Sequence, residues 1–156
     1  MKKLVMTLLL VALLTAGAHA QELTDHDYFS AAELDAFAEA LAADASAGPG
    51  RIVDQSNYFA AISHRQPGPG MSESHRDWAD LYFVSSGTGT LVVGGAIRGG
   101  RETGPGEIRG TSIEGGIRRM LAEGDVVHIP AGTPHHVIVA AGEQLTYVLF
   151  KVRAEP

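Results

Sequence analysis

The chain has 156 residues, of which 18 are acidic and 12 basic, giving a net charge of −6, and it contains no cysteine. Its first twenty residues carry two lysines, an apolar run from Leu4 to Leu14 and the ending Ala18-His19-Ala20, the pattern of a secretory signal peptide over 1–20. The run is too short to span a bilayer. Beyond it Lys151 is the only lysine, which argues against nucleic acid and anionic membranes as partners, because clustered Lys and Arg bind phosphate groups.

The leader predicts an exported protein, periplasmic or secreted, that has no membrane segment once the signal is cleaved. About 136 residues would then remain, a length that normally makes one domain. Without cysteine, the hydrophobic core must hold the fold in an oxidising compartment without disulfides.

The segment after the leader, 21–50, is predicted to form a helical arm. Ser30 and Glu33 match a capping box, and the glycines and proline of 48–50 should end the segment. Four apolar residues follow helical spacing: Leu34, Phe37, Ala38 and Leu41. Such a stripe is typical of a helix that packs on a core, here over an open barrel end, while a lid or a dimer contact are the alternatives.

From residue 51 onward the sequence changes to short β-prone runs separated by Gly and Pro, which predicts an all-β sandwich or small barrel over 51–156. The predicted strands are Asn57 to Ser63, Leu81 to Val84, Thr90 to Val93, Asp125 to Ile129, His136 to Val139 and Leu145 to Val152. Turns are predicted at 67–70, 86–89 and 141–142. The glycine-rich stretch 94–124 should form a hairpin and a long connection.

Two segments carry motifs whose spacing is specific. In the second segment Gly124, Pro130, Gly132 and His135 follow the pattern Gly, five residues, Pro-x-Gly, two residues, His. In the first, the positions of a His-x-His, four residues, Glu, six residues, Gly motif hold Glu73, His75, Asp80 and Gly87.

With these motifs the sequence resembles the cupin superfamily over about 51–152. Two ligand types of the first motif differ, since Glu73 replaces a histidine and Asp80 a glutamate. The resemblance implies a cupin-type, jelly-roll β-barrel with a short N-terminal helix, a metal site and a possible homodimer.

The residue types support a metal site independently of the family. Residues two apart on a strand share a face, so Glu73 and His75 point the same way, and Asp80 and Tyr82 do so on the next strand. Carboxylates inside a narrow barrel need compensation, which a divalent cation supplies. Two imidazoles with carboxylates suit Fe(II), Mn(II), Ni(II) or Zn(II). The predicted ligands are Glu73, His75, Asp80 and His135, and the harder oxygen of Glu73 favours Fe or Mn.

A metal-free arrangement is the alternative, with Asp80 bonded to His75, Glu73 turned to solvent and His135 satisfied by the backbone. In the metal-bound arrangement Glu73 would be a fourth ligand or a base. Tyr82 would donate a proton or orient substrate, or else simply pack in the barrel. His136 should face away from His135.

Three residues near these motifs have no role that the sequence fixes: His64, Trp78 and Tyr147. His64 could enter the pocket, and Trp78, expected in the loop before Asp80, could gate the mouth or anchor the loop.

Two functions fit this pattern. The first is a metal-dependent dioxygenase, isomerase or lyase acting on a small oxygen-rich molecule. The second is a non-catalytic cupin that binds a small ligand or a metal, since one fold serves many chemistries. No dinucleotide motif has the required spacing, so no nucleotide cofactor is expected.

Overall fold

A computed structural model describes residues 26–44 and 48–154, so the predicted signal peptide, 1–20, lies outside the described residues. The described part contains one helix, α1 (Ala31–Ala42). This helix is not long and apolar enough to cross a membrane. The strands are β1 (Gly50–Asp54), β2 (Tyr58–Arg65), β3 (Ser72–His75), β4 (Trp78–Val93), β5 (Ala96–Arg98), β6 (Arg101–Gly104), β7 (Glu107–Gly110), β8 (Ser112–Glu114), β9 (Ile117–Ala122), β10 (Val126–Ile129), β11 (His135–Ile138) and β12 (Leu145–Arg153).

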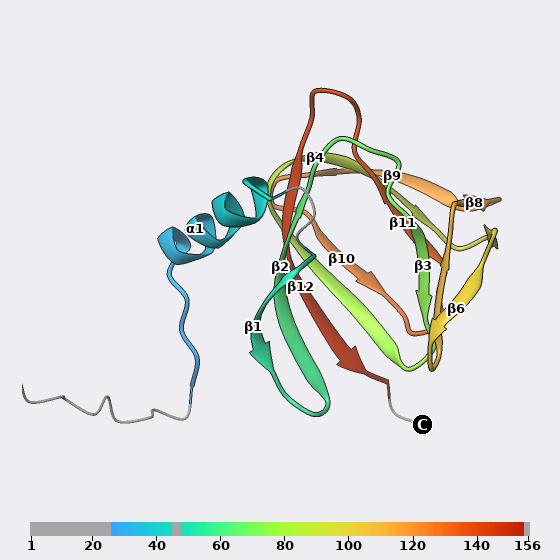
Figure 1. The fold of residues 1–156 in the computed structure, drawn as a ribbon, viewed down its shortest axis with the longest axis horizontal. Helices are drawn as coiled ribbons and strands as arrows, with labels where there is room; N and C mark the ends of the chain where they lie inside the picture. Colours follow the sequence, from blue (N-terminus) through green and yellow to red (C-terminus); the bar gives the residue numbers. More distant parts are fainter. Residues whose placement is uncertain (1–25, 45–47, 155–156) are drawn as a thin grey trace, which may run out of the picture.

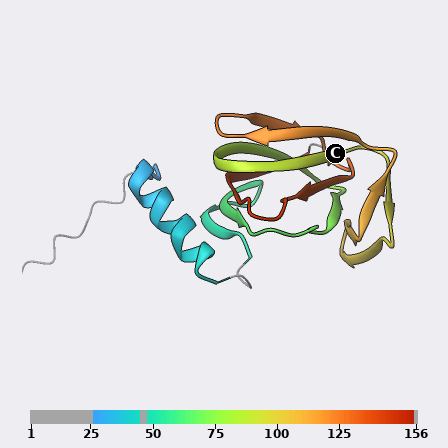
Figure 2. The ribbon, with the colours of Figure 1, turned by 90° about the horizontal axis from the view of Figure 1, so that it is seen from above.

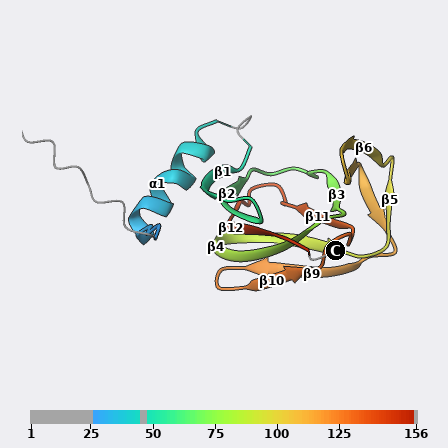
Figure 3. The ribbon, with the colours of Figure 1, turned by 90° about the horizontal axis from the view of Figure 1, so that it is seen from below.

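The long strand β4 organises the barrel because its two halves pair with different neighbours. Its first half lies between β12 and β10, and its second half between β11 and β9, all antiparallel. The sheet therefore curls over into two facing layers, with β1 and β2 beyond β12 and with β3, β7 and β6 beyond β11 (Figure 1). Strands β5 and β8 form a separate pair at the end of the molecule opposite α1 (Figures 1 and 3).

The inward-facing rows change from polar to apolar along each strand, which divides the barrel interior into two ends. Three rows show this: Asp80-Tyr82-Val84 on β4, His135-Val137 on β11, and Lys151-Leu149-Tyr147-Leu145 on β12. The apolar residues of these rows join Leu91, Leu121 and Ile129 in the buried core. Since alternate residues share a face, the same rows gather the polar side chains at the other end.

The turn predicted at 86–89 is wrong, because β4 continues through it. A shift in the β12–β4 register between Thr146 and Tyr147 leaves one extra residue on β4, a β-bulge. Gly87 follows this bulge with φ at +79°, paired with Leu145. Glycine here permits a bulge inside one strand and does not end it.

Replacing Gly87 by alanine should destabilise the protein by roughly 3 kcal/mol or more, because a positive φ is unfavourable for alanine and the new Cβ would overlap the backbone carbonyl of Gln144. Gly142 is the control, with φ at +83° and open space where its Cβ would lie. Urea unfolding of the Gly142→Ala variant should show a loss of only about 1 kcal/mol. Equal losses for both variants would contradict the role of close packing at Gly87.

The capping box of the helix is confirmed: the Ser30 side chain accepts from the Glu33 backbone N–H, and the Glu33 carboxylate accepts from the Ser30 N–H. The helix packs against β2 through its C-terminal end, where Gln66 donates to the carbonyl of Ala42. Its N-terminal half extends away from the barrel (Figures 1 and 2), and Phe37 stays 41% exposed. The helix therefore leaves part of its apolar stripe uncovered and does not cap a barrel end.

The glycine-rich stretch 94–124 holds five short strands, β5 to β9, and not the single hairpin and long connection that the sequence predicted. Strands β6 and β7 extend the sheet beyond β3. This extension matters for function because β7 lies beside the strand that carries Glu73 and His75.

Candidate metal centre

Four polar side chains that the sequence singled out meet inside the barrel. His135 Nε2 lies 3.3 Å from Asp80 Oδ2 and 3.6 Å from Glu73 Oε1. His75 Nε2 lies 3.8 Å from an oxygen of each of the same carboxylates. Ligand atoms of Glu73, His75 and His135 all lie within 4.8 Å of one another, so these three residues form a possible metal site that Asp80 adjoins.

Strand register explains how residues far apart in sequence converge here. Glu73 lies opposite His135 of β11 on one side and opposite Arg109 of β7 on the other. His75 lies opposite Glu107 of β7. Directly opposed residues in antiparallel strands present their side chains on one face, so three neighbouring strands bring five polar groups to the barrel interior.

Each imidazole is held through its Nδ1 atom. His135 Nδ1 lies 2.9 Å from the backbone carbonyl oxygen of Thr133, and His75 Nδ1 contacts the Glu107 carboxylate. Both partners are acceptors, so each Nδ1 carries the proton, and Nε2 of the neutral ring holds the lone pair. Both Nε2 atoms are buried, and when the rings are neutral neither accepts a hydrogen bond from the described residues. Metal-ligating histidines are oriented by this kind of outer hydrogen bond, so the pair fits a metal ion.

Asp80 is fixed from two sides by groups that leave one oxygen toward the imidazoles. Its Oδ1 lies 2.6 Å from Nζ of Lys151, and its Oδ2 accepts a hydrogen bond of 3.3 Å from the Tyr82 hydroxyl. The side chain is almost fully buried. Asp80 Oδ2 is therefore the oxygen available to an ion.

Basic side chains already compensate much of the negative charge, which the sequence argument attributed to a divalent cation alone. Arg109 Nη1 lies 3.0 Å from Glu73 Oε2, and Arg65 Nη2 lies 4.0 Å from Glu73 Oε1. Lys151 does the same for Asp80. The case for a metal therefore depends on the two buried imidazole Nε2 atoms that face these carboxylates, and burial of the carboxylates does not by itself require an ion.

The ionisation of these groups follows from their mutual contacts. Burial opposes ionisation of Glu73 and Asp80, but nearby positive groups outweigh it and lower both pKa values, that of Glu73 to about 2. His135 acts on both carboxylates, His75 and Arg109 also act on Glu73, and Lys151 also acts on Asp80. Burial alone would lower the pKa of His135, yet the two carboxylates raise it to about 9. Burial and Lys151 lower the pKa of His75. The metal-free site thus holds a proton on His135, between two carboxylates.

The metal-free arrangement considered from the sequence is only partly matched. The Glu73 side chain is 12% exposed and faces inward, whereas that arrangement turned it to solvent. His135 does contact the backbone, but only through Nδ1. Its Nε2 faces the carboxylates of Glu73 and Asp80, which the arrangement considered from the sequence did not include as partners of His135.

Two other histidines lie outside the site. His64 Nδ1 is 2.9 Å from Thr146 Oγ1, and the ring lines a hollow beside Leu41 of the helix, away from the metal centre. His136 faces away from His135, as expected, and its Nε2 contacts the carbonyl oxygen of Pro69.

The two aromatic residues whose roles the sequence left open have different positions. Trp78 begins β4 and is not in a loop, and its ring lies 5.8 Å from that of Phe59. Tyr147 lies at the site: its ring is 4.6 Å from that of Tyr82, and its hydroxyl accepts from Arg65 Nε at 3.2 Å. Tyr147 therefore joins Tyr82 in the wall beside the metal centre.

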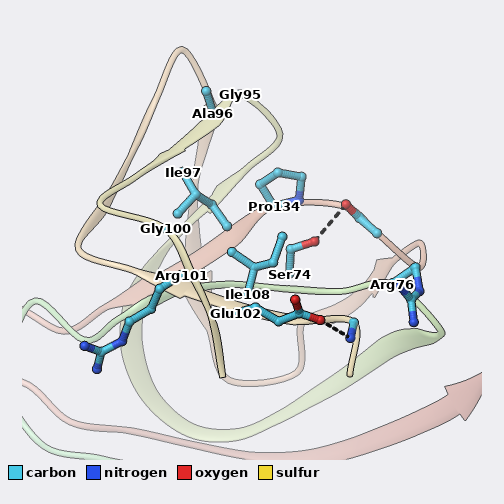
Figure 4. Close-up of a pocket in the computed structure, with 12 residues that line it drawn as sticks. Ser74, Arg76, Gly95, Ala96, Ile97, Gly100, Arg101, Glu102, Ile108 and Pro134 are labelled. Carbon is cyan, nitrogen blue, oxygen red and sulfur yellow. Dashed lines mark hydrogen bonds between the residues drawn. The ribbon is translucent and has the colours of Figure 1, made fainter. Parts of the chain in front are cut away.

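A cavity of about 390 Å³ opens beside the metal centre, and Glu73 and Tyr82 both line it. A larger hollow of about 670 Å³ lies on the opposite side of β3. Figure 4 shows Ser74, Ile97, Ile108 and Pro134 around this second hollow. Because Ser74 stands between Glu73 and His75, the hollow in Figure 4 is separated from the metal centre by the strand itself.

Replacing Glu107 by alanine should weaken metal binding by about 10- to 100-fold, because His75 would lose the acceptor that fixes its ring and its tautomer. The exposed Glu123, in the turn after β9, is the matched control. Titration of the metal-free variants with Mn²⁺, followed by calorimetry, measures the effect. Unchanged affinity in the Glu107→Ala variant would show that His75 is not oriented by this carboxylate.

No protein-family model and no curated protein matches this sequence. Solved structures do match its fold. A cupin protein from Bacteroides fragilis is 15% identical, with a TM-score of 0.52 over 85% of this chain and 87% of its own. A conserved protein with a double-stranded β-helix domain from Klebsiella pneumoniae is 18% identical, with a TM-score of 0.56 over 82% of this chain and 85% of its own.

The protein therefore has the cupin fold, an all-β jelly-roll with a short helix before it in the described part of the chain, and the predicted fold class is confirmed. It is a cupin-fold protein with a possible metal site at Glu73, His75 and His135.

Proposed function

We propose that this protein is a metal-dependent enzyme that acts on a small, oxygen-rich molecule as a dioxygenase, isomerase or lyase. The observation that carries the proposal is the pair of buried imidazole Nε2 atoms, each oriented through Nδ1 and facing carboxylates. His75, His135 and Glu73 would hold the ion, with Asp80 adding Oδ2. The mixed nitrogen and oxygen donors favour Fe or Mn, while Zn and Ni also suit them.

When bound, a divalent ion supplies Lewis-acid chemistry to a substrate oxygen. The chain's own groups define what happens around it. Glu73 stays ionised because its pKa is about 2, and a base works best with a pKa near the working pH. This favours Glu73 as a ligand over Glu73 as a base.

Tyr82 remains a neutral phenol, because burial and then Tyr147 and Asp80 raise its pKa well above the usual value. Its hydroxyl donates to Asp80 and lines the cavity. Because its single O–H is used on Asp80, this phenol would orient a substrate by accepting a hydrogen bond from a substrate hydroxyl. The alternative function is capture of a small ligand or a metal without turnover. Basic side chains that already compensate the carboxylates favour capture of a small ligand, since they leave less negative charge for an ion to neutralise.

The test is metal analysis of the protein expressed with its leader, followed by oxygen-uptake and product assays on a panel of small oxygen-rich molecules. One equivalent of Fe or Mn per chain, with turnover that stops when a chelator removes it, is the expected result. Stoichiometric metal without turnover would support the binding protein. A wild-type protein carrying no more metal than the His135→Ala variant would contradict both metal-dependent functions.

We also propose that the protein is exported to the periplasm or secreted, and that it forms a homodimer. The leader pattern of 1–20 supports the first, and the half-covered stripe on α1 supports the second. N-terminal sequencing should begin at Gln21, and light scattering should give twice the mass of the processed chain.

A further inference from the structure

The cavity beside the metal centre has a basic lining that the proposed metal chemistry does not use. Arg65, Arg109 and Lys151 all line it, together with Glu73 and Tyr82. Lys151 is committed to Asp80 at 2.6 Å. The two arginines remain part-exposed, at 35% and 39% of their side chains, so they face the opening.

Each of the two guanidinium groups has more N–H donors than its present contacts use. Arg65 uses Nε for the Tyr147 hydroxyl, and its Nη2 stands 4.0 Å from Glu73. Arg109 directs Nη1 to Glu73 at 3.0 Å. A guanidinium has five N–H donors in a planar fork suited to a carboxylate, so each arginine can bind a further oxyanion while keeping its present contact. Arg51 also lines the cavity but is paired with Asp54.

The charges of the side chains around the cavity indicate which net charge a ligand would have. The acidic groups are Glu73, Asp80 and Glu107, and the basic groups are Arg65, Arg109 and Lys151, so they cancel when both imidazoles are neutral. A divalent ion would leave this cluster with an excess of two positive charges. A ligand with two negative charges restores neutrality in a site partly shielded from water.

We propose that the cavity binds a small dicarboxylate, with one carboxylate toward the metal centre and the other held by Arg65 and Arg109. This inference rests on the proposed metal site and names its substrate class. The volume of about 390 Å³ suits a small molecule. Phe59, Met71 and Leu149 line the same cavity and provide apolar contact for a short carbon chain between the two carboxylates.

The experiment is calorimetric titration of the Mn²⁺-loaded protein, expressed from the full chain and purified after export, with malonate, succinate, glutarate and inorganic phosphate. Succinamide is the uncharged partner of succinate. The double variant Arg65→Gln/Arg109→Gln is compared with Arg118→Gln, whose exposed arginine lies on β9 and does not line the cavity. Each single variant is titrated in parallel. The thermal unfolding and the metal content of every variant are also measured, so that a defect in folding or in metal binding is recognised.

At least one dicarboxylate should bind the wild type and the Arg118→Gln variant with equal affinity. Its affinity for the double variant should be at least tenfold lower, at unchanged metal content. Succinamide should bind at least tenfold more weakly than succinate. The inference is overturned if no dicarboxylate binds the metal-loaded wild type, if phosphate binds as well as every dicarboxylate, or if the double variant binds as the wild type does. Absence of metal from the wild type would instead contradict the proposed function.

Discussion

Replacing His135 by alanine should lower the affinity for the metal by about a thousandfold or more, beyond the roughly 10- to 100-fold loss expected for an outer partner. His135 supplies one of the two orphaned Nε2 atoms, and it contacts both carboxylates of the site. Without it Glu73 and Asp80 would face each other across an unfilled space, with one imidazole left for the ion. Calorimetry with Mn²⁺ on the metal-free variant measures this loss.

His136→Ala is the matched control, because His136 is the next residue, is equally buried, and faces the other side of β11. This variant should lose about 1 kcal/mol or more of stability through its contact with the Pro69 carbonyl, but it should keep its metal affinity. Equal metal affinity in the wild type and both variants would contradict a metal centre at His135. Equal loss in both variants would indicate damage to β11 and not removal of a ligand.

The alternation of side chains along strands made part of the site predictable. Glu73 and His75 are two residues apart, and so are Asp80 and Tyr82, so each pair was expected on one face of its strand. His135 joined this set through the resemblance to the cupin motif that runs from Gly124 to His135, since the strand predicted there began only at His136.

The outer partners could not be predicted, because their positions depend on register between distant strands. Glu107 and Arg109 lie on β7, a four-residue strand in a glycine-rich stretch whose sequence indicated a connection. Only pairing with β3 places them beside His75 and Glu73. Lys151 lies two residues before the end of β12, and nothing in the sequence near it indicates its pairing with Asp80.

The predicted boundaries of the strand that became β4 are wrong for a related reason. Gly87 and Gly89 look like turn residues in the sequence, but a bulge lets β4 pass through them with its pairing to β12 intact. A glycine with positive φ is required both at turns and at bulges. The sequence alone does not distinguish these two uses, since the difference lies in whether a partner strand continues alongside.

Metal affinity should rise about tenfold for each pH unit from 6.5 to 9 and then level off. The cause is the proton on His135 in the metal-free protein, whose pKa the two carboxylates raise to about 9 against the opposing effect of burial. An ion must displace this proton to reach Nε2. Calorimetry near pH 7.5 in buffers of different ionisation enthalpy should therefore show release of about one proton per metal bound.

The stability of the metal-free protein should move in the opposite direction over the same interval. A histidine whose folded pKa is raised contributes stability that is fully present below its unfolded pKa of about 6.5 and is lost as pH rises through 9. The raised value corresponds to roughly 3 kcal/mol. Shifts of Glu73 and Asp80 act below this interval, where carboxylates titrate, and the shift of Tyr82 acts above it.

The His135→Ala variant separates this proton from every other pH effect. Urea unfolding of the metal-free wild type at pH 6.5 and pH 9 should show the wild type losing stability with rising pH, and the variant losing much less. The same wild type loaded with Mn²⁺ should keep a nearly constant stability over that interval, because the ion has displaced the proton and the gain in metal affinity offsets the loss of the proton's contribution. A wild type and a variant with parallel pH profiles would show that His135 carries no shared proton, and that the ion and the proton do not compete for its Nε2 atom.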